Sequence, residues 1–126
     1  MALGKIKADT LEHSTAGTVD TQYVVNGSAK AHASYAGSGT SFSSSFNCSS
    51  AVDNGTGKYS VNLSSALSAT AQVTPIGSCN VNGDSSTTAT TTIVVSTSAY
   101  KTNTSNDQGS FTDAAGVFSV LMGDLA

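Results

Sequence analysis

The stretch Asp53-Asn54-Gly55-Thr56-Gly57-Lys58-Tyr59-Ser60-Val61-Asn62-Leu63 decides the fold class. Its first five residues are turn formers, because glycine and asparagine accept a positive φ. The next six alternate strictly, so that Tyr59, Val61 and Leu63 fall on one face of a strand and polar residues fall on the other. A turn followed by such a strand predicts an antiparallel hairpin with one buried face and one solvated face.

Further runs with β character lie on both sides of this hairpin. They are residues 22–26, 29–36, 40–47, 69–74, 87–98 and 116–122. Short strands separated by turn signals every 8–12 residues or so are typical of a sandwich. The sequence therefore predicts an all-β protein, a small antiparallel β-sandwich that is jelly-roll-like.

Several details follow from the same alternation. Phe42 and Phe46 are expected to share one face of their strand, and alternate residues of 69–74 are expected to point inward. Pro75, the only proline, should end that run or mark a sheet edge. The polar segments 80–86 and 101–110 are expected to be exposed loops.

Composition excludes several classes of protein. The basic residues are five lysines against eight acidic residues, which gives a net charge of −3 and no basic surface for nucleic acid. No apolar run approaches the ~18 residues of a membrane span. Hydrophobic residues make up 38% of the chain, which argues against a disordered tail.

Large apolar side chains are scarce, because only 6% of the residues are aromatic and serine, threonine, alanine and glycine fill most other positions. Burial contributes about 25 cal/mol per Å², so a single copy is expected to be marginally stable and to gain burial from other copies. Residues 116–122 are apolar on both faces, and a strand of that kind must be covered on both sides. The candidate subunit interface is Val117, Phe118, Val120, Leu121 and Met122.

Residues 1–20 differ from the rest, and we expect an N-terminal arm there, either extended or one short helix, followed by the sandwich domain at 21–126. The candidate anchor residues of this arm are Leu3, Ile6 and Leu11. The N-terminus lacks the apolar segment of a signal peptide, which predicts synthesis in the cytoplasm.

No pattern points to catalysis. Cys48 and Cys79 are expected to be small buried hydrophobes, with a disulfide as the alternative. His13 and His32 have no metal-ligand spacing, and neither forms a nucleophile–base motif with Cys48. The alternating oxygen side chains of 80–84 resemble a piece of a calcium loop, but the distal Glu of an EF-hand is missing. We predict no enzyme, no metal site and no cofactor.

Two segments resemble a known family. KADTLEHSTAGTVDTQYVVNGSAKA (7–31) and SFNCSSAVDNGTGKYSVNLSSAL (45–67) are similar to structural proteins of tailed bacteriophages, found in marine phages as distal parts of tail fibres or as short virion proteins. The most specific piece runs from Asp53 to Asn62. Where that family often has a tryptophan after Ala-Lys-Ala, this chain has His32. The resemblance implies a virion component that forms a homotrimer and names no catalytic residue.

Two functions compete within that setting. A fibre or spike subunit would contact a glycan or protein of the host surface through its loops, gaining affinity by multivalency. A capsid decoration protein would instead hold the head through its arm. Remote alternatives are a bacterial adhesin module and a polysaccharide-degrading enzyme with a carboxylate pair. The candidate receptor-facing residues are Asn80, Asn82, Asp84, Asn103, Asn106 and Asp107.

Overall fold

The predicted hairpin is confirmed as strands β5 (Cys48–Asp53) and β6 (Lys58–Leu63). The computed structural model describes residues 7–37, 41–80 and 87–123. In the turn, the Asn54 amide donates to the Lys58 carbonyl and the Lys58 amide donates to the Gly55 carbonyl, both at 2.8 Å. Gly57 has a φ of 65°, and a Cβ there would lie 2.5 Å from the Thr104 carbonyl oxygen. The turn therefore requires glycine at this position.

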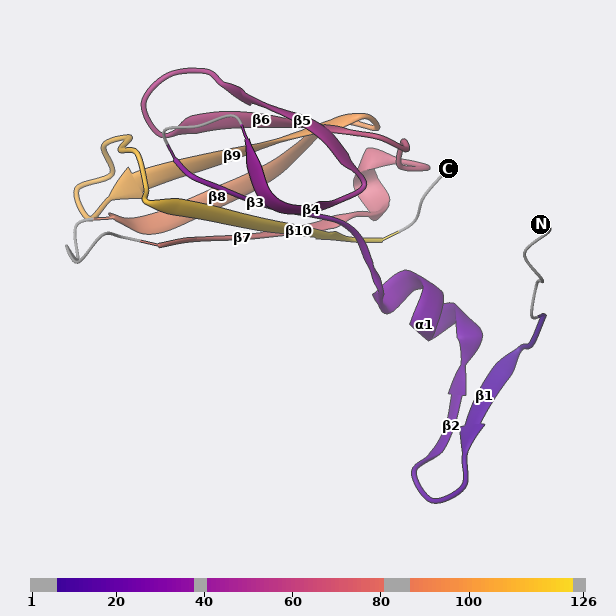
Figure 1. The fold of residues 1–126 in the computed structure, drawn as a ribbon. Coiled ribbons are helices and arrows are strands. Elements are labelled where there is room, and N and C mark those ends of the chain that lie inside the picture. Colours follow the sequence, from indigo (N-terminus) through magenta and orange to yellow (C-terminus); the bar gives the residue numbers. More distant parts are fainter. Residues whose placement is uncertain (1–6, 38–40, 81–86, 124–126) are drawn as a thin grey trace.

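In the described residues, eight strands form two four-stranded antiparallel sheets that pack face to face, as Figure 1 shows. The first sheet has the order β4 (Phe42–Phe46), β3 (Ala29–Tyr35), β10 (Gly116–Met122), β7 (Thr74–Asn80). The second has the order β5, β6, β9 (Ala99–Asn106), β8 (Thr87–Ser96). The expectation of an all-β sandwich is confirmed. Three pairs of sequence neighbours form hairpins, β3 with β4, β5 with β6 and β8 with β9. The first and last strands of the sandwich, β3 and β10, lie side by side.

The core lies between the sheets and is built around Tyr35, Tyr59 and Tyr100. Small residues such as Ala31 and Ala33 fill the space between the larger ones. The other buried hydrophobic residues are Ala51, Val61, Leu63, Leu67, Ala114, Val117 and Leu121. Tyrosine thus supplies the volume that a chain poor in leucine and phenylalanine lacks.

The expectation that Phe42 and Phe46 share a face is wrong. Phe42 pairs with Tyr35 and Phe46 pairs with His32, with a register shift between these two pairs. The extra residue of this bulge reverses the alternation. Phe42 therefore packs edge-on against Tyr35 in the core, whereas Phe46 lies outside against His32.

The N-terminal arm consists of a hairpin, β1 (Thr10–His13) with β2 (Gly17–Asp20), and a short helix, α1 (Thr21–Gly27). It projects from one end of the sandwich (Figure 1). The strand expected at 22–26 is therefore wrong, and the sandwich strands begin at Ala29. The first turn of α1 is tied to the hairpin, because the Thr21 amide donates to the Asp9 carbonyl at 2.8 Å.

The other end of α1 is held by the sandwich. Lys30 is buried, and its Nζ donates to the Val25 carbonyl and, at 2.9 Å, to Ser28 Oγ. A cation at this position satisfies helix carbonyls that have no partner within the helix and interacts favourably with the helix dipole. These contacts fix the direction in which the arm leaves the sandwich.

Two other expectations are corrected. Residues 70–72 form a 3₁₀ turn with Ala71 exposed, and the strand begins only at Thr74. Pro75 lies in β7, an edge strand, which is one of the two positions expected for it. Residues 101–106 belong to β9, a central strand, rather than to a loop. Thr102 and Thr104 point inward along β9, so both faces of the strand look polar in the sequence.

We predict that Val117→Ala lowers the free energy of unfolding by about 2 kcal/mol, because it removes two buried methyl groups and leaves a cavity. Val117 is 0% exposed. Val52→Ala is the matched control, since Val52 is 43% exposed, and it should change stability by less than about 0.5 kcal/mol. Urea unfolding measures both, and equal losses in the two variants would contradict the described core.

Candidate interaction surfaces

The candidate receptor-facing residues do not form one loop. Asn103 lies within β9, opposite Lys58 and Thr91, on the outer face of its sheet. Asn106 ends β9, and its Oδ1 accepts the amides of Gln108 and Ser110. Two of the candidates are exposed: Asp107, in the following turn, and Asn80, at the end of β7. Asn82 and Asp84 lie outside the described residues.

The most fully hydrogen-bonded polar cluster lies at the end of the sandwich remote from the arm. Asp113 Oδ1 accepts the Gly57 amide at 2.7 Å and the Tyr59 hydroxyl at 2.9 Å. The Tyr59 hydroxyl also donates to the Gly37 carbonyl. Burial, with the Asp113 carboxylate second, raises the pKa of Tyr59 far above its usual range. Asp113 thus joins three connections of the sandwich, which is a structural role.

Tyr35 differs from Tyr59 in its hydroxyl. The Tyr35 hydroxyl and the nearby Thr102 hydroxyl are buried, and neither has a hydrogen-bond partner of normal geometry in the described structure. We expect Tyr35→Phe to leave the free energy of unfolding unchanged or to raise it, because no hydrogen bond is lost. Tyr59→Phe should cost about 1–3 kcal/mol, because it orphans the buried Gly37 carbonyl. Denaturant unfolding compares them, and a larger loss in Tyr35→Phe would contradict this assignment.

The same tyrosine makes stability depend on pH at the alkaline end. Burial raises the pKa of Tyr35 from 10.0 to about 12. A raised folded-state pKa means that the contribution of the neutral phenol is complete below pH 10 and is lost as the pH rises toward 12. The Tyr35→Phe variant should therefore lose less stability than the parent over this interval, and equal losses would contradict the pKa shift.

Cys48 and Cys79 are free thiols that pack against the core. Cys48 Sγ donates to the main-chain carbonyl of His32 at 3.3 Å. The His32 ring instead stacks on Phe46, with 6.1 Å between ring centroids. Cys48 therefore bonds the backbone of His32 and not its imidazole. Within residues 7–37, 41–80 and 87–123, no three His, Cys, Asp or Glu side chains gather into a metal-binding group.

Burial raises the pKa of the Cys48 thiol, which lowers its thiolate fraction and hence its reactivity. We predict that Cys48, isolated in a Cys79→Ser variant, reacts with Ellman's reagent at pH 8 at least about tenfold more slowly in the folded protein than in urea. A folded-state rate equal to that of the unfolded chain would contradict this environment.

The candidate subunit interface is corrected in part, because the strand β10 divides it between two faces. Val117 and Leu121 are fully buried in the core of their own chain and cannot contact another copy. Phe118, Val120 and Met122 alternate with them and face outward. The physical reason is that the second sheet packs against one face of the sheet that contains β10, so this chain itself covers that face (Figure 1).

The outer face of this sheet carries an apolar row. The strand registers place Phe46, His32, Val120 and Ile76 directly beside one another across β4, β3, β10 and β7. Phe118 lies in the next outward row. The outer apolar face consists of this row of four residues together with Phe118 and Met122 of β10.

Charge is almost absent from this sheet. Its four strands contain one charged residue, Lys30, which is buried against the end of α1. Large contiguous apolar patches on protein surfaces are typical of interaction sites, which makes this face a candidate. The signal in the sequence was the two-sided apolar pattern of 116–122, but Phe46 and Ile76 join the face only through strand pairing.

A second uncovered surface lies on the arm. Leu11, Val19, Val24 and Val25 are all exposed, and α1 has no buried residue. Leu11, Val24 and Val25 line an open hollow between the hairpin and the helix. Of the candidate anchor residues, Leu11 is thus exposed as expected, while Leu3 and Ile6 lie outside the described residues.

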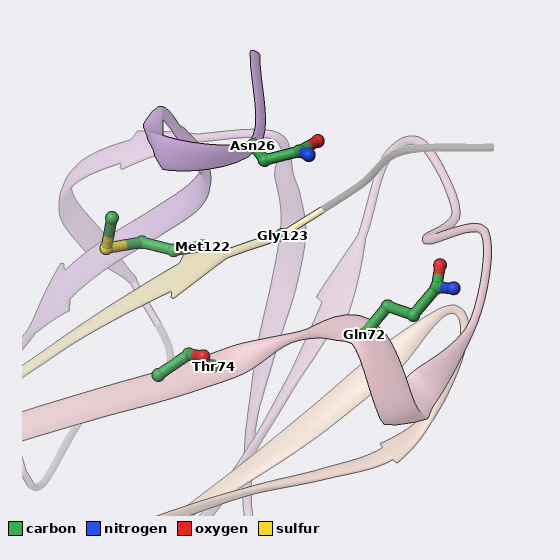
Figure 2. Close-up of a pocket in the computed structure, with 5 residues that line it drawn as sticks. All are labelled: Asn26, Gln72, Thr74, Met122 and Gly123. Atoms are coloured by element: carbon green, nitrogen blue, oxygen red, sulfur yellow. The ribbon is translucent and has the colours of Figure 1, made fainter. Parts of the chain in front are cut away.

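An open hollow of about 540 Å³ lies where the arm meets the sandwich. Figure 2 shows that Asn26 comes from the helix, Met122 and Gly123 from the end of β10, and Gln72 and Thr74 from the entry into β7. Amides and a hydroxyl dominate the lining. Met122 belongs both to this hollow and to the outer apolar face, so the two surfaces are continuous.

Comparison of the chain with protein-family models, with curated proteins and with solved structures finds no match. Among the described residues, no helix has the length and hydrophobicity needed to span a membrane.

Proposed function

We propose that the chain is a non-enzymatic structural component of a bacteriophage particle surface, a trimeric fibre or spike subunit that contacts the host cell. The observation that carries the proposal is the exposed apolar arm, which a solitary molecule would leave uncovered. The resemblance of 7–31 and 45–67 to phage virion proteins supplies the kind of assembly. No cofactor enters this function.

The placement of surfaces supports a protein that is held at one end and presents the other. The arm leaves the sandwich beside the hollow of Figure 2. The turn that follows β9, in which Asp107 is exposed, lies at the opposite end of the sandwich (Figure 1). The Asp113 cluster fixes the connections there, and a fixed loop loses little entropy when it binds. Weak contacts of this kind gain affinity when three copies present them together.

A capsid decoration protein is the second candidate. The observation that favours it is again the arm, whose exposed Leu11 and Val19 would suit a groove on a capsid subunit. In that function the arm contacts another virion protein, and the sandwich projects from the head. The two functions differ in the location of the chain on the particle and in the partner of the arm.

Immunogold labelling of intact phage particles with an antibody to the sandwich tests this proposal. We expect labelling at the tail tip or fibres. Uniform labelling of the head would establish the decoration function instead. Purified particles without any label, together with no peptide of this chain in their mass spectrum, would contradict both functions.

A further inference from the structure

The arm consists of two elements that are marginally stable in water by themselves. Helices shorter than about 12 residues are marginal in isolation, and α1 spans seven residues with no side-chain hydrogen bond from its N-cap residue Asp20. A single two-stranded hairpin is also marginal without a covering layer. Among the residues that the structure describes, no third strand pairs with the hairpin β1–β2. The arm therefore needs a surface that covers its apolar residues.

The arm presents those residues on one side. Leu11 and Val19 pair directly across the hairpin and share a face. The opposite face carries Glu12 and Asp20, together with threonines, and remains suited to water. Leu11 also lines the hollow with Val24 and Val25, so its side of the hairpin continues onto the helix, with Lys7 and Asp9 at the same hollow.

The outer apolar face matches this side in chemistry. It presents rings and aliphatic groups, and its four strands contain no carboxylate that would repel the acidic hairpin. Every chain carries one arm and one such face. Within one chain the hairpin is kept apart from this face, because the Lys30 hydrogen bonds direct the arm away from the sandwich (Figure 1), and only the end of α1 borders the face, at Asn26.

Resting on the proposed function, we propose that the arm of one copy lies across the outer apolar face of a second copy. The lengths are compatible, because each four-residue strand of the hairpin extends about 13 Å and the row from Phe46 to Ile76 crosses three inter-strand spacings, about 14 Å. An arm-on-face contact is heterologous, so each copy binds the next copy through a different surface. Three copies form a closed ring when the rotation between neighbouring copies is about 120°, one third of a turn. The same contact covers both exposed surfaces of every subunit.

The test uses two variants of the full chain, each with one half of the contact disrupted. Leu11→Asp places a charge on the arm, where Leu11 is 46% exposed, and Ile76→Asp places one on the face, where Ile76 is 51% exposed. Ile93→Asp is the matched control, because Ile93 is 47% exposed on β8, the edge strand of the other sheet. Phe46→Asp repeats the face substitution if Ile76→Asp does not fold.

Sedimentation velocity of folded variants, verified by circular dichroism, measures the association. We expect the parent and Ile93→Asp to associate, and Leu11→Asp and the face variant to associate at least about tenfold more weakly. An equimolar mixture of the two weakened variants should restore heterodimers, because one supplies an intact arm and the other an intact face.

A monomeric parent chain, a face variant that associates normally, or a mixture that stays monomeric would each overturn the inference. These outcomes are separate from the fate of the proposed function. A particle that carries the label while the parent chain is monomeric retains the virion function and removes only the arm-on-face contact. Restored heterodimers without any label on the particle would remove only the virion function.

Discussion

Burial of apolar surface is the constraint on which the rest of this structure depends. The sandwich meets it with three buried tyrosines and many small residues, and Tyr100 satisfies its hydroxyl on Ser119 at 2.7 Å. The arm does not meet it, because its leucine and valines remain in contact with water. The sandwich therefore buries its own core, whereas the apolar residues of the arm stay exposed. This difference gives the assembly proposal its physical basis.

The sandwich could be predicted where one face of a strand is apolar and the other polar, as in Lys58–Leu63. It could not be predicted where threonine points inward, as at Thr102 and Thr104, because β9 then resembles an exposed loop. The helix α1 was missed because Val24 and Val25 favour strands. Its ends are held instead by two hydrogen bonds to residues outside the helix, from the Thr21 amide to the Asp9 carbonyl and from Lys30 Nζ to the Val25 carbonyl. Hydrogen bonds of this kind leave no hydrophobic periodicity in the sequence of the helix.

The candidate surface was predictable in the same limited sense. The apolar residues of 116–122 correctly indicated a strand, and this chain covers one of its two faces. The cover expected on the other face stays a prediction, and the sequence does not tell which residues lie on which face. Val117 and Leu121 are covered by their own chain, whereas Phe118 and Val120 are the outward-facing set. Phe46 reaches that set only because a bulge in β4 reverses its side chain, and a bulge of this kind has no sequence signature here.

The central claim is that the arm is completed by another molecule. Hydrogen–deuterium exchange at a series of protein concentrations tests it most directly, because amides of the arm and of the sandwich are followed in the same sample. The account predicts that protection of residues 10–27 rises with concentration while protection of β6 and β9 stays high throughout. Arm amides that remain equally protected in dilute, monomeric protein would contradict the account.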